Sequence, residues 1–126
     1  MVCADDIAVI AHRDSKFGDL TLQEVAYTYL GKTINLHGSG ETPVKLYDLQ
    51  DGVLRERFFR ILTNADLNQV NAYWARLQFS GTVLPPIRLS DSQAVLNAVS
   101  HNPNTIGYID ATLVNPSVKV LLFLRE

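Results

Sequence analysis

The sequence has few of the residues that mark specialised classes of protein. Its 126 residues include one cysteine, seven glycines and five prolines. A single cysteine forms neither an internal disulfide nor a zinc cluster of its own. The ordinary glycine and proline counts exclude collagen-like and low-complexity chains. The longest uninterrupted apolar runs, Ile7–Ala11 and Val120–Leu124, are too short to cross a bilayer as a helix.

An excess of one charge is also absent. The chain has 11 lysines and arginines against 13 aspartates and glutamates, and its net charge is −2. This balance predicts no nucleic-acid partner and no attraction to an anionic membrane surface. Hydrophobic residues make up 47% and charged residues 19%, which excludes intrinsic disorder. The composition therefore indicates one globular domain with a core of its own.

The N-terminus resembles the end of an export signal. Val2, Cys3 and Ala4 place small or medium side chains one and three positions before Asp5. We expect cleavage after Ala4, a single domain over 5–126, and a periplasmic location, with residues 1–4 left over from the signal. If this segment is not an export signal, we expect Cys3 to be a thiol without a functional role.

Two of the four predicted helices have capping signals. Thr21 and Glu24 have the spacing of a capping box, and the helix that follows ends at Gly31. Ser90 and Gln93 have the same spacing before the last helix. Apolar residues at helical spacing support both helices.

Five short runs predict strands, and two further helices lie between the second and third of them. These helices cover residues 52–62 and 67–79, with Phe58, Phe59 and Trp74 expected in the core. Strands that alternate with helices indicate an α/β fold, with a mostly parallel sheet of about five strands flanked by helices. The predicted strands are Ile7–Ala11, Val44–Tyr47, Ile87–Leu89, Thr105–Asp110 and Val118–Leu124.

In open α/β sheets, ligands bind beyond the carboxyl ends of the strands. Four loops qualify, at residues 12–15, 48–52, 90–92 and 110–112. Two of them lead into helix N-termini, where free backbone N–H groups favour an anion. The candidate ligand-binding residues are Ser15, Gln50, Asp51, Gly52, Ser90, Asp91 and Ser92.

No catalytic or metal constellation is evident. His12, Asp14 and Ser15 are neighbours in sequence, which does not supply the spatial arrangement of a triad. The segment Gly38-Ser39-Gly40 lacks the lysine and the following helix of a phosphate-binding loop. His101 and the other histidines lack metal-ligand spacing. We therefore expect no enzyme activity, no metal and no cofactor.

Three arginines of the 52–62 helix raise the possibility of an anion-binding face. Arg55, Arg57 and Arg60 follow one another within six residues, and Glu56 stands four positions before Arg60. Because such an i,i+4 pair is typical of a solvated surface, we interpret this face as solvent-exposed.

Several segments together resemble the phosphate-type substrate-binding proteins of ABC transporters. Leu20–Val25 followed by Tyr29-Leu30-Gly31-Lys32 resembles that family's helix ending in Phe-Leu-Gly-Lys. The segment Asn102–Asp110 resembles its Asn-Pro-Gly-Ala-Ile-Gly-Tyr turn into a strand. Further similar segments are Arg57–Phe59 and Tyr73–Gly81.

The resemblance implies an exported protein with one lobe of the type II periplasmic-binding fold. Full family members close two lobes around phosphate, which they hold through a Ser-Gly-Thr stretch with an arginine and an aspartate just upstream. The matching segment here, Asp48–Arg55, keeps only Gly52 and an aspartate in kind. We expect Asp51 to cap the following helix and to repel a second anion. Phosphate binding in the family manner is therefore not expected.

Two functions remain open at this point. In the first, the chain is a module that binds a small anion or another solute. It does so alone or as a homodimer, in which the second copy supplies the other wall of the ligand cleft. Alternatively, it is an interaction module that docks on a membrane sensor or transporter without a small ligand. A solute would raise the melting temperature, whereas a docking module would expose an apolar patch at the strand ends.

Overall fold

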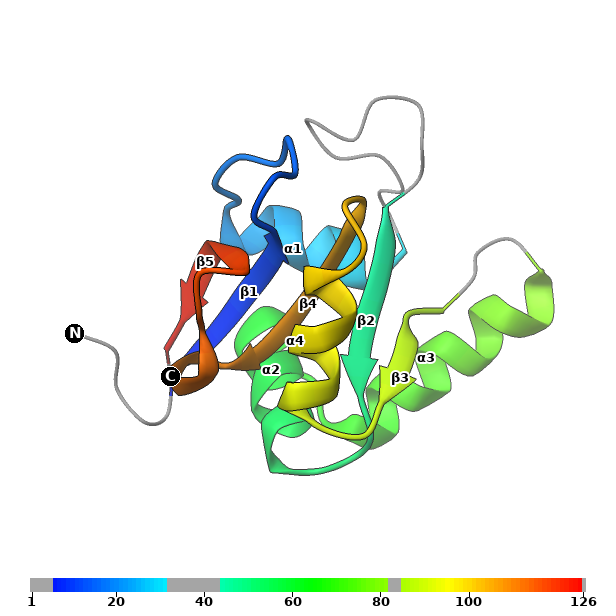
Figure 1. Cartoon of the computed structure of the whole chain (residues 1–126). Helices are drawn as coiled ribbons and strands as arrows, with labels where there is room; N and C mark the ends of the chain where they lie inside the picture. Colours follow the sequence, from blue (N-terminus) through cyan, green and yellow to red (C-terminus); the bar gives the residue numbers. More distant parts are fainter. Residues whose placement is uncertain (1–5, 32–43, 82–84, 126) are drawn as a thin grey trace.

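The computed structural model describes residues 6–31, 44–81 and 85–125 (Figure 1). The predicted strands and helices are all present in these residues, with ends that differ by one or two positions. The elements are β1 (Ile7–His12), α1 (Leu22–Tyr29), β2 (Lys45–Leu49), α2 (Val53–Thr63), α3 (Leu67–Ser80), β3 (Ile87–Leu89), α4 (Ser92–Ser100), β4 (Thr105–Asp110), the short 3-10 helix η1 (Ala111–Leu113) and β5 (Val118–Leu124).

The five strands form one sheet in the order β3-β2-β4-β1-β5. β2 runs parallel to both β3 and β4, whereas β1 pairs antiparallel with β4 on one side and with β5 on the other. The prediction of a mostly parallel sheet is therefore wrong, and the sheet is mixed. The apolar run of β1 marks a strand with two buried faces, but it carries no information about direction.

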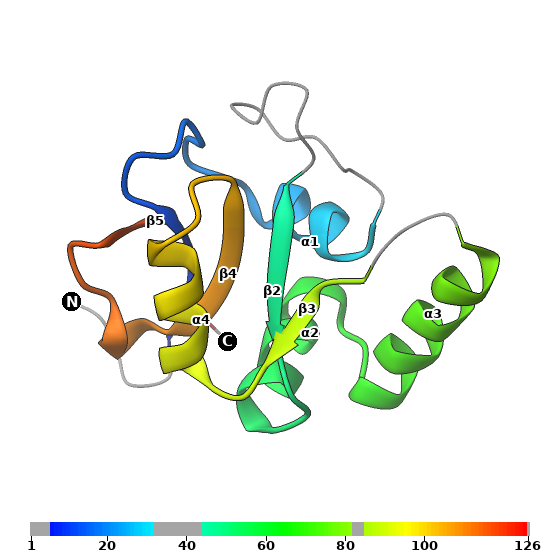
Figure 2. The same ribbon diagram turned by 45° about the vertical axis from the view of Figure 1, so that its right-hand side comes forward.

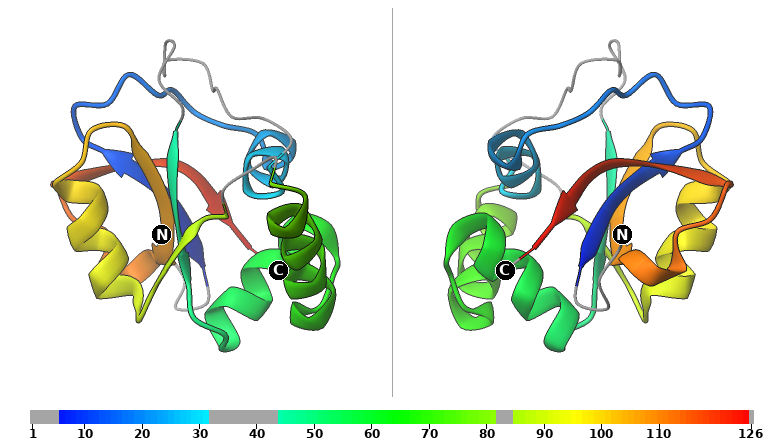
Figure 3. Two further views of the ribbon diagram at one scale, coloured as in Figure 1. Left: turned by 90° about the vertical axis from the view of Figure 1, so that its right-hand side faces the viewer. Right: turned by 90° about the vertical axis from the view of Figure 1, so that its left-hand side faces the viewer.

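Helices cover both faces of the sheet. α4 lies on one face, and α1, α2 and α3 lie on the other (Figure 3). β1 is an interior strand between β4 and β5, and Ile7 through Ala11 are all 0% exposed. Phe58 and Phe59 are also 0% exposed and Trp74 is 5% exposed, which confirms their predicted place in the core.

Two of the helix starts test the capping predictions. Thr21 and Glu24 form the expected capping box, with the Glu24 backbone N–H donating to Thr21 Oγ1 over 3.1 Å. The second predicted box is wrong. α4 is capped by Asp91, whose Oδ1 accepts from the Ala94 N–H over 2.9 Å. Asp91 is the capping residue because it stands three positions before Ala94, and its carboxylate reaches the Ala94 backbone N–H, which has no acceptor within the helix.

In the described part of the chain, no helix is both long and apolar enough to pass through a membrane.

Candidate functional site

β2, β3 and β4 run in one direction, so their carboxyl ends meet at one edge of the sheet. This edge brings together the candidates at 50–52 and 90–92. β1 runs the other way, and the loop that follows it, with Ser15, lies at the opposite edge. The expectation that all four loops share one edge is therefore wrong for Ser15. Its Oγ is buried without a hydrogen-bond partner, far from the other candidates.

A buried ion network occupies the end of β2 and the first turn of α2. Arg55 is 1% exposed, and its Nε donates to Asp48 Oδ2 over 3.1 Å. Its Nη1 donates to Asp51 Oδ1 over 2.8 Å. The guanidinium also lies over the ring of Phe59, 5.0 Å from the ring centroid. Both carboxylates are thereby paired with the same side chain of the protein.

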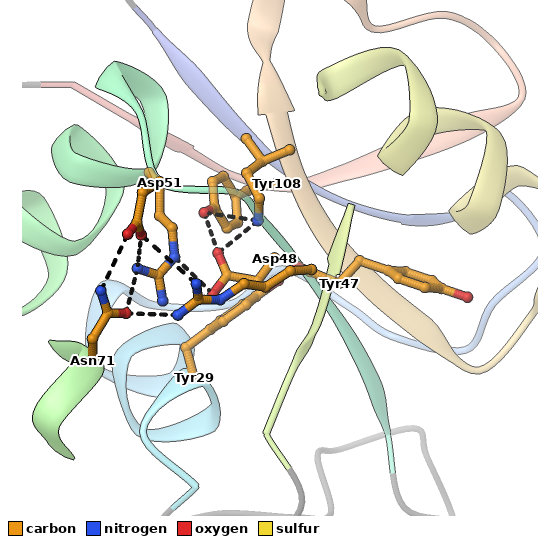
Figure 4. A network of polar contacts seen from close by, with 9 residues as sticks. Tyr29, Tyr47, Asp48, Asp51, Asn71 and Tyr108 are labelled. Carbon is orange, nitrogen blue, oxygen red and sulfur yellow. Dashed lines mark hydrogen bonds and ion pairs between the residues drawn. The ribbon is translucent and has the colours of Figure 1, made fainter. Parts of the chain in front are cut away.

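α3 and β3 complete this network (Figure 4). Asn71 Oδ1 accepts from Arg55 Nη1 over 2.9 Å and from Arg88 Nη2 over 2.6 Å. Asn71 Nδ2 donates to Asp51 Oδ2 over 3.3 Å, and Arg88 Nη1 lies 3.8 Å from Asp51 Oδ1. Two guanidiniums therefore face two carboxylates, and the network carries no net charge.

Asp48 also connects the network to the aromatic core. Its Oδ1 accepts from the Tyr108 hydroxyl and, over 2.7 Å, from the Leu49 N–H. The Tyr108 ring stacks on Phe58 with 3.6 Å between the ring centroids. Burial, and then the Asp48 charge, raise the pKa of Tyr108 well above 10.0. The same two causes raise the pKa of Tyr29, whose hydroxyl donates to the Tyr47 carbonyl over 2.8 Å.

Two expectations for this loop are corrected. The first residue before α2 is Gly52, and no side chain caps the helix. Asp51 does not cap because its carboxylate is held by Arg55 and Asn71 instead. Arg55 is not part of a solvated face either, because the carboxylate of Asp48 lies within reach on the buried side of α2. The Glu56–Arg60 pair does form on the exposed side, with 3.4 Å between Oε1 and Nη1.

The candidates in the other loop are largely engaged within the fold. Asp91 caps α4, and Ser92 Oγ accepts from the Asp110 N–H over 3.0 Å. Ser90 and Gln50 are exposed, and the Gln50 N–H donates to the Leu89 carbonyl over 3.0 Å. Gly52 is exposed as well. Among the candidate residues that the structure describes at this edge, Ser90 has a hydroxyl without a hydrogen-bond partner, and Gly52 has exposed backbone.

The sequence predictions missed Asp48, Arg55, Asn71 and Arg88 as members of one cluster. One local signal existed, since Asp51 and Arg55 have the i,i+4 spacing of a helical ion pair. Nothing local links them to Asn71 or Arg88, which come from other elements.

The described residues contain no group of three or more histidine, cysteine, aspartate or glutamate side chains that would hold a metal ion. The segment Gly38-Ser39-Gly40 and His37 lie outside the described residues.

Comparison with solved structures reveals several similar folds, although no protein-family model and no curated protein matches the sequence. A Clostridium perfringens protein, described as a phosphate ABC transporter substrate-binding protein and solved with bound phosphate, matches with a TM-score of 0.73 and 25% identity. A phosphate transport receptor of the ABC type from Vibrio cholerae matches with 0.70 and 16%, and PstS from Borrelia burgdorferi with 0.67 and 14%.

Each match covers 91% of this chain but only 43%, 44% and 46% of the respective partner. The chain therefore spans less than half the length of these proteins. They are described as binding and receptor proteins rather than enzymes. The resemblance inferred from the sequence is confirmed: the chain has the fold of one lobe of a phosphate-type ABC transporter substrate-binding protein.

Proposed function

We propose that this chain is an exported solute-binding-like module that does not hold phosphate on the Asp48–Arg55 loop in the manner of its structural relatives. The fold supports a solute-binding-like module, and the Arg55 ion network supports the absence of phosphate binding on this loop. A phosphate site needs cationic or N–H donors that are free for the ligand. Here Asp48 and Asp51 already accept from Arg55 at 3.1 and 2.8 Å.

The charges around Arg55 oppose a dianion. A phosphate placed at the start of α2 would lie beside the carboxylate of Asp51, which is 53% exposed. Two unit charges of like sign at 4 Å repel by about 4 kcal/mol at an effective dielectric constant of about 20. The loop also lacks hydroxyl side chains from Asp48 to Arg55. The few hydrogen bonds that its backbone offers would be offset by this repulsion.

Thermal unfolding in the presence of small solutes tests the proposal. A solute at 100 times its Kd adds about 2.7 kcal/mol to the free energy of unfolding, which raises Tm by several degrees for a domain of this size. We expect at least one non-phosphate solute in a panel of small anions, carboxylates and neutral metabolites to do so. Phosphate at 5 mM is expected to shift Tm by about 1 °C or less.

Asp51→Ser is the informative variant. It removes the exposed carboxylate, adds a hydroxyl, and leaves the buried Asp48–Arg55 pair in place. A phosphate-dependent Tm shift is expected to emerge in this variant, whereas the matched variant Asp14→Ser on the opposite edge is expected to stay unresponsive. A shift of several degrees with phosphate in the unmodified protein would contradict the proposal.

A docking function is the second candidate, and exposed apolar side chains at the strand-end edge favour it. Val53, the first residue of α2, is 74% exposed, and Leu113 in η1 is 39% exposed. A membrane sensor or transporter that covers this edge would bury both. In that case no solute raises Tm, and Val53→Asp abolishes capture of the partner from a membrane extract while Phe123→Asp on β5 does not.

Export to the periplasm is part of the proposal and rests on the fold relation and on the segment Val2-Cys3-Ala4. Fractionation of the producing cells, with sequencing of the mature N-terminus, tests it. A protein that begins at Asp5 in the periplasmic fraction is the expected result, and an uncleaved protein in the cytoplasm would contradict it.

A further inference from the structure

A pocket of about 330 Å³ lies between α3 and β3, to the side of the strand-end edge. α3 is the outermost helix on this side of the molecule, next to the edge strand β3 (Figure 2). The volume is at the lower end of the range for small-molecule sites. None of the candidate residues predicted from the sequence lines this pocket. Its lining consists of Asp48, Arg55, Asn71, Trp74, Gln78, Pro85, Pro86 and Arg88.

Two hydrogen-bond donors of the lining lack an acceptor among the described residues. Trp74 is 5% exposed, and its indole Nε1 is buried without a hydrogen-bond partner. Arg55 uses its Nε and Nη1 in the ion network and leaves Nη2 without a bond to a described residue. A buried donor without an acceptor costs about 1–3 kcal/mol. A ligand that brings acceptor oxygens into the pocket would remove this cost.

The charge of the lining matches one negative charge. The lining contains two positive charges, those of Arg55 and Arg88, and one negative charge, that of Asp48. The Asp48 carboxylate already accepts hydrogen bonds from Arg55, Tyr108 and the Leu49 N–H. Asp51 does not line the pocket but contacts both arginines. Its charge disfavours a dianion. With Asp51 included the network is neutral, so a ligand with one negative charge is repelled less than a dianion and is favoured over it.

The remaining lining is apolar. Pro85, Pro86 and the ring of Trp74 present hydrocarbon and aromatic surface beside the arginines. A compact apolar body can cover this surface while an attached carboxylate accepts from a guanidinium. Inorganic phosphate has no such body.

We propose that this pocket binds a small organic monocarboxylate. Its carboxylate accepts from Arg88 and from the unpaired donors of Arg55 and Trp74, and its apolar part packs against Pro85 and Pro86. The inference rests on the proposed solute-binding function, because it names the class of solute and places it beside β3 rather than on the strand-end loops.

Benzoate is a suitable probe, because it joins one carboxylate to a compact apolar ring. Trp74 is the sole tryptophan of the chain, so its indole N–H gives a single side-chain peak in a ¹H–¹⁵N correlation spectrum. Titration with benzoate is expected to shift this peak saturably in the millimolar range. Benzamide, a neutral molecule of the same shape, and inorganic phosphate are expected to shift it little.

Variants of Gln78 and Arg88 separate binding from folding. Gln78 is exposed and its side chain makes no hydrogen bond to a described residue, so Gln78→Glu adds a negative charge to the lining without breaking the ion network. We expect Arg88→Gln to weaken benzoate binding about tenfold, through the loss of one charge-assisted hydrogen bond. Gln78→Glu is expected to weaken it by a similar factor, through repulsion between two negative charges. Gln78→Ala is the neutral comparison, and Arg76→Gln, on the same helix but outside the lining, is the matched control.

The outcomes are distinct. Absence of a saturable shift up to 20 mM benzoate, equal shifts with benzamide, or equal weakening by Arg76→Gln and Arg88→Gln would overturn this inference. If benzoate fails while another solute of the panel raises Tm, the solute-binding function stands and the pocket assignment falls. If no solute raises Tm and the indole peak does not move, both fail.

Discussion

Arg55 is the residue on which the candidate site depends most. Its guanidinium is 1% exposed and faces Asp48, which is 2% exposed. Burial of two charges costs several kcal/mol per ion. The attraction within the ion pair offsets this cost only when further hydrogen bonds satisfy the remaining donors and acceptors. Asp51, Asn71 and Phe59 add further contacts to the guanidinium. Removal of one partner therefore leaves a buried charge without compensation.

We predict that Arg55→Met lowers the free energy of unfolding by about 3–5 kcal/mol, because it strands the buried Asp48 carboxylate. Urea denaturation followed by circular dichroism measures the loss. Arg60→Met is the matched control on the same helix. Arg60 is 45% exposed in its side chain, and its pair with Glu56 is worth about 0.5 kcal/mol or less. Equal losses in the two variants would refute the role given to Arg55.

Two buried tyrosines make stability sensitive to alkaline pH. Burial raises the pKa of Tyr29 and Tyr108 well above 10.0, and the Asp48 charge adds to the effect. Above about pH 10 the unfolded chain loses these protons while the folded chain retains them. The free energy of unfolding is thus unaffected by these groups below pH 10, and falls above it by about 1.4 kcal/mol per pH unit for each tyrosine.

Tyr108→Phe is expected to remove about half of this slope, because one of the two tyrosines no longer titrates. Urea denaturation at a series of pH values from 8 to 11 measures it. Tyr27→Phe serves as a control, because Tyr27 is 42% exposed whereas Tyr108 is 0% exposed. An unchanged slope in Tyr108→Phe would contradict the assignment.

At the scale of the elements, the packing of α4 on β4 depends on a glycine. β4 carries Gly107, and a Cβ built there would lie 2.5 Å from Val95 Cγ1 and 3.2 Å from Val99 Cγ2 of α4. Val95 is 0% exposed and stiff at its first side-chain torsion. The missing side chain at 107 lets the helix approach the sheet.

We predict that Gly107→Ala lowers the free energy of unfolding by about 1–3 kcal/mol through overpacking. Val95→Ala by itself also destabilises, by opening a cavity. The double variant is expected to be more stable than the sum of the two losses implies, since the new methyl group occupies the vacated space. A double-mutant cycle by urea denaturation measures this coupling, and strictly additive losses would show that the two side chains do not compete for space.

At the scale of the whole molecule, one edge of the sheet carries the carboxyl ends of three parallel strands. This chain spans 43–46% of the length of the solved proteins it matches. Val53 and Leu113 lie exposed at this edge, which suits a surface that meets a second copy or another protein.

We predict concentration-dependent pairing through this edge, measured by sedimentation velocity from micromolar to near-millimolar protein. Val53→Asp is expected to abolish the pairing, because it places a charge in an apolar contact. Phe79→Asp is the control: Phe79 is 96% exposed but lies in the last turn of α3, away from the strand ends. A strict monomer at the highest concentration, or loss of pairing in Phe79→Asp alone, would contradict the prediction.

The local sequence determined the positions of the helices and strands, the Thr21–Glu24 cap and the burial of Phe58, Phe59 and Trp74. These follow from periodicity and from hydrogen bonds between residues three or four positions apart. The resemblance to a phosphate-type lobe also came from the sequence, through short segments spread along the chain.

The tertiary structure alone decided the direction of β1 and the surroundings of Arg55. A buried apolar run reads the same in either direction, so only its pairing with β4 and β5 places Ser15 at the far edge. Likewise, an arginine followed by a glutamate on a helix predicts an exposed face. In the folded chain, however, Asp48, Asn71 and Arg88 come from separate elements and surround the Arg55 side chain. Burial and ion pairing are properties of segments that meet only in the folded chain.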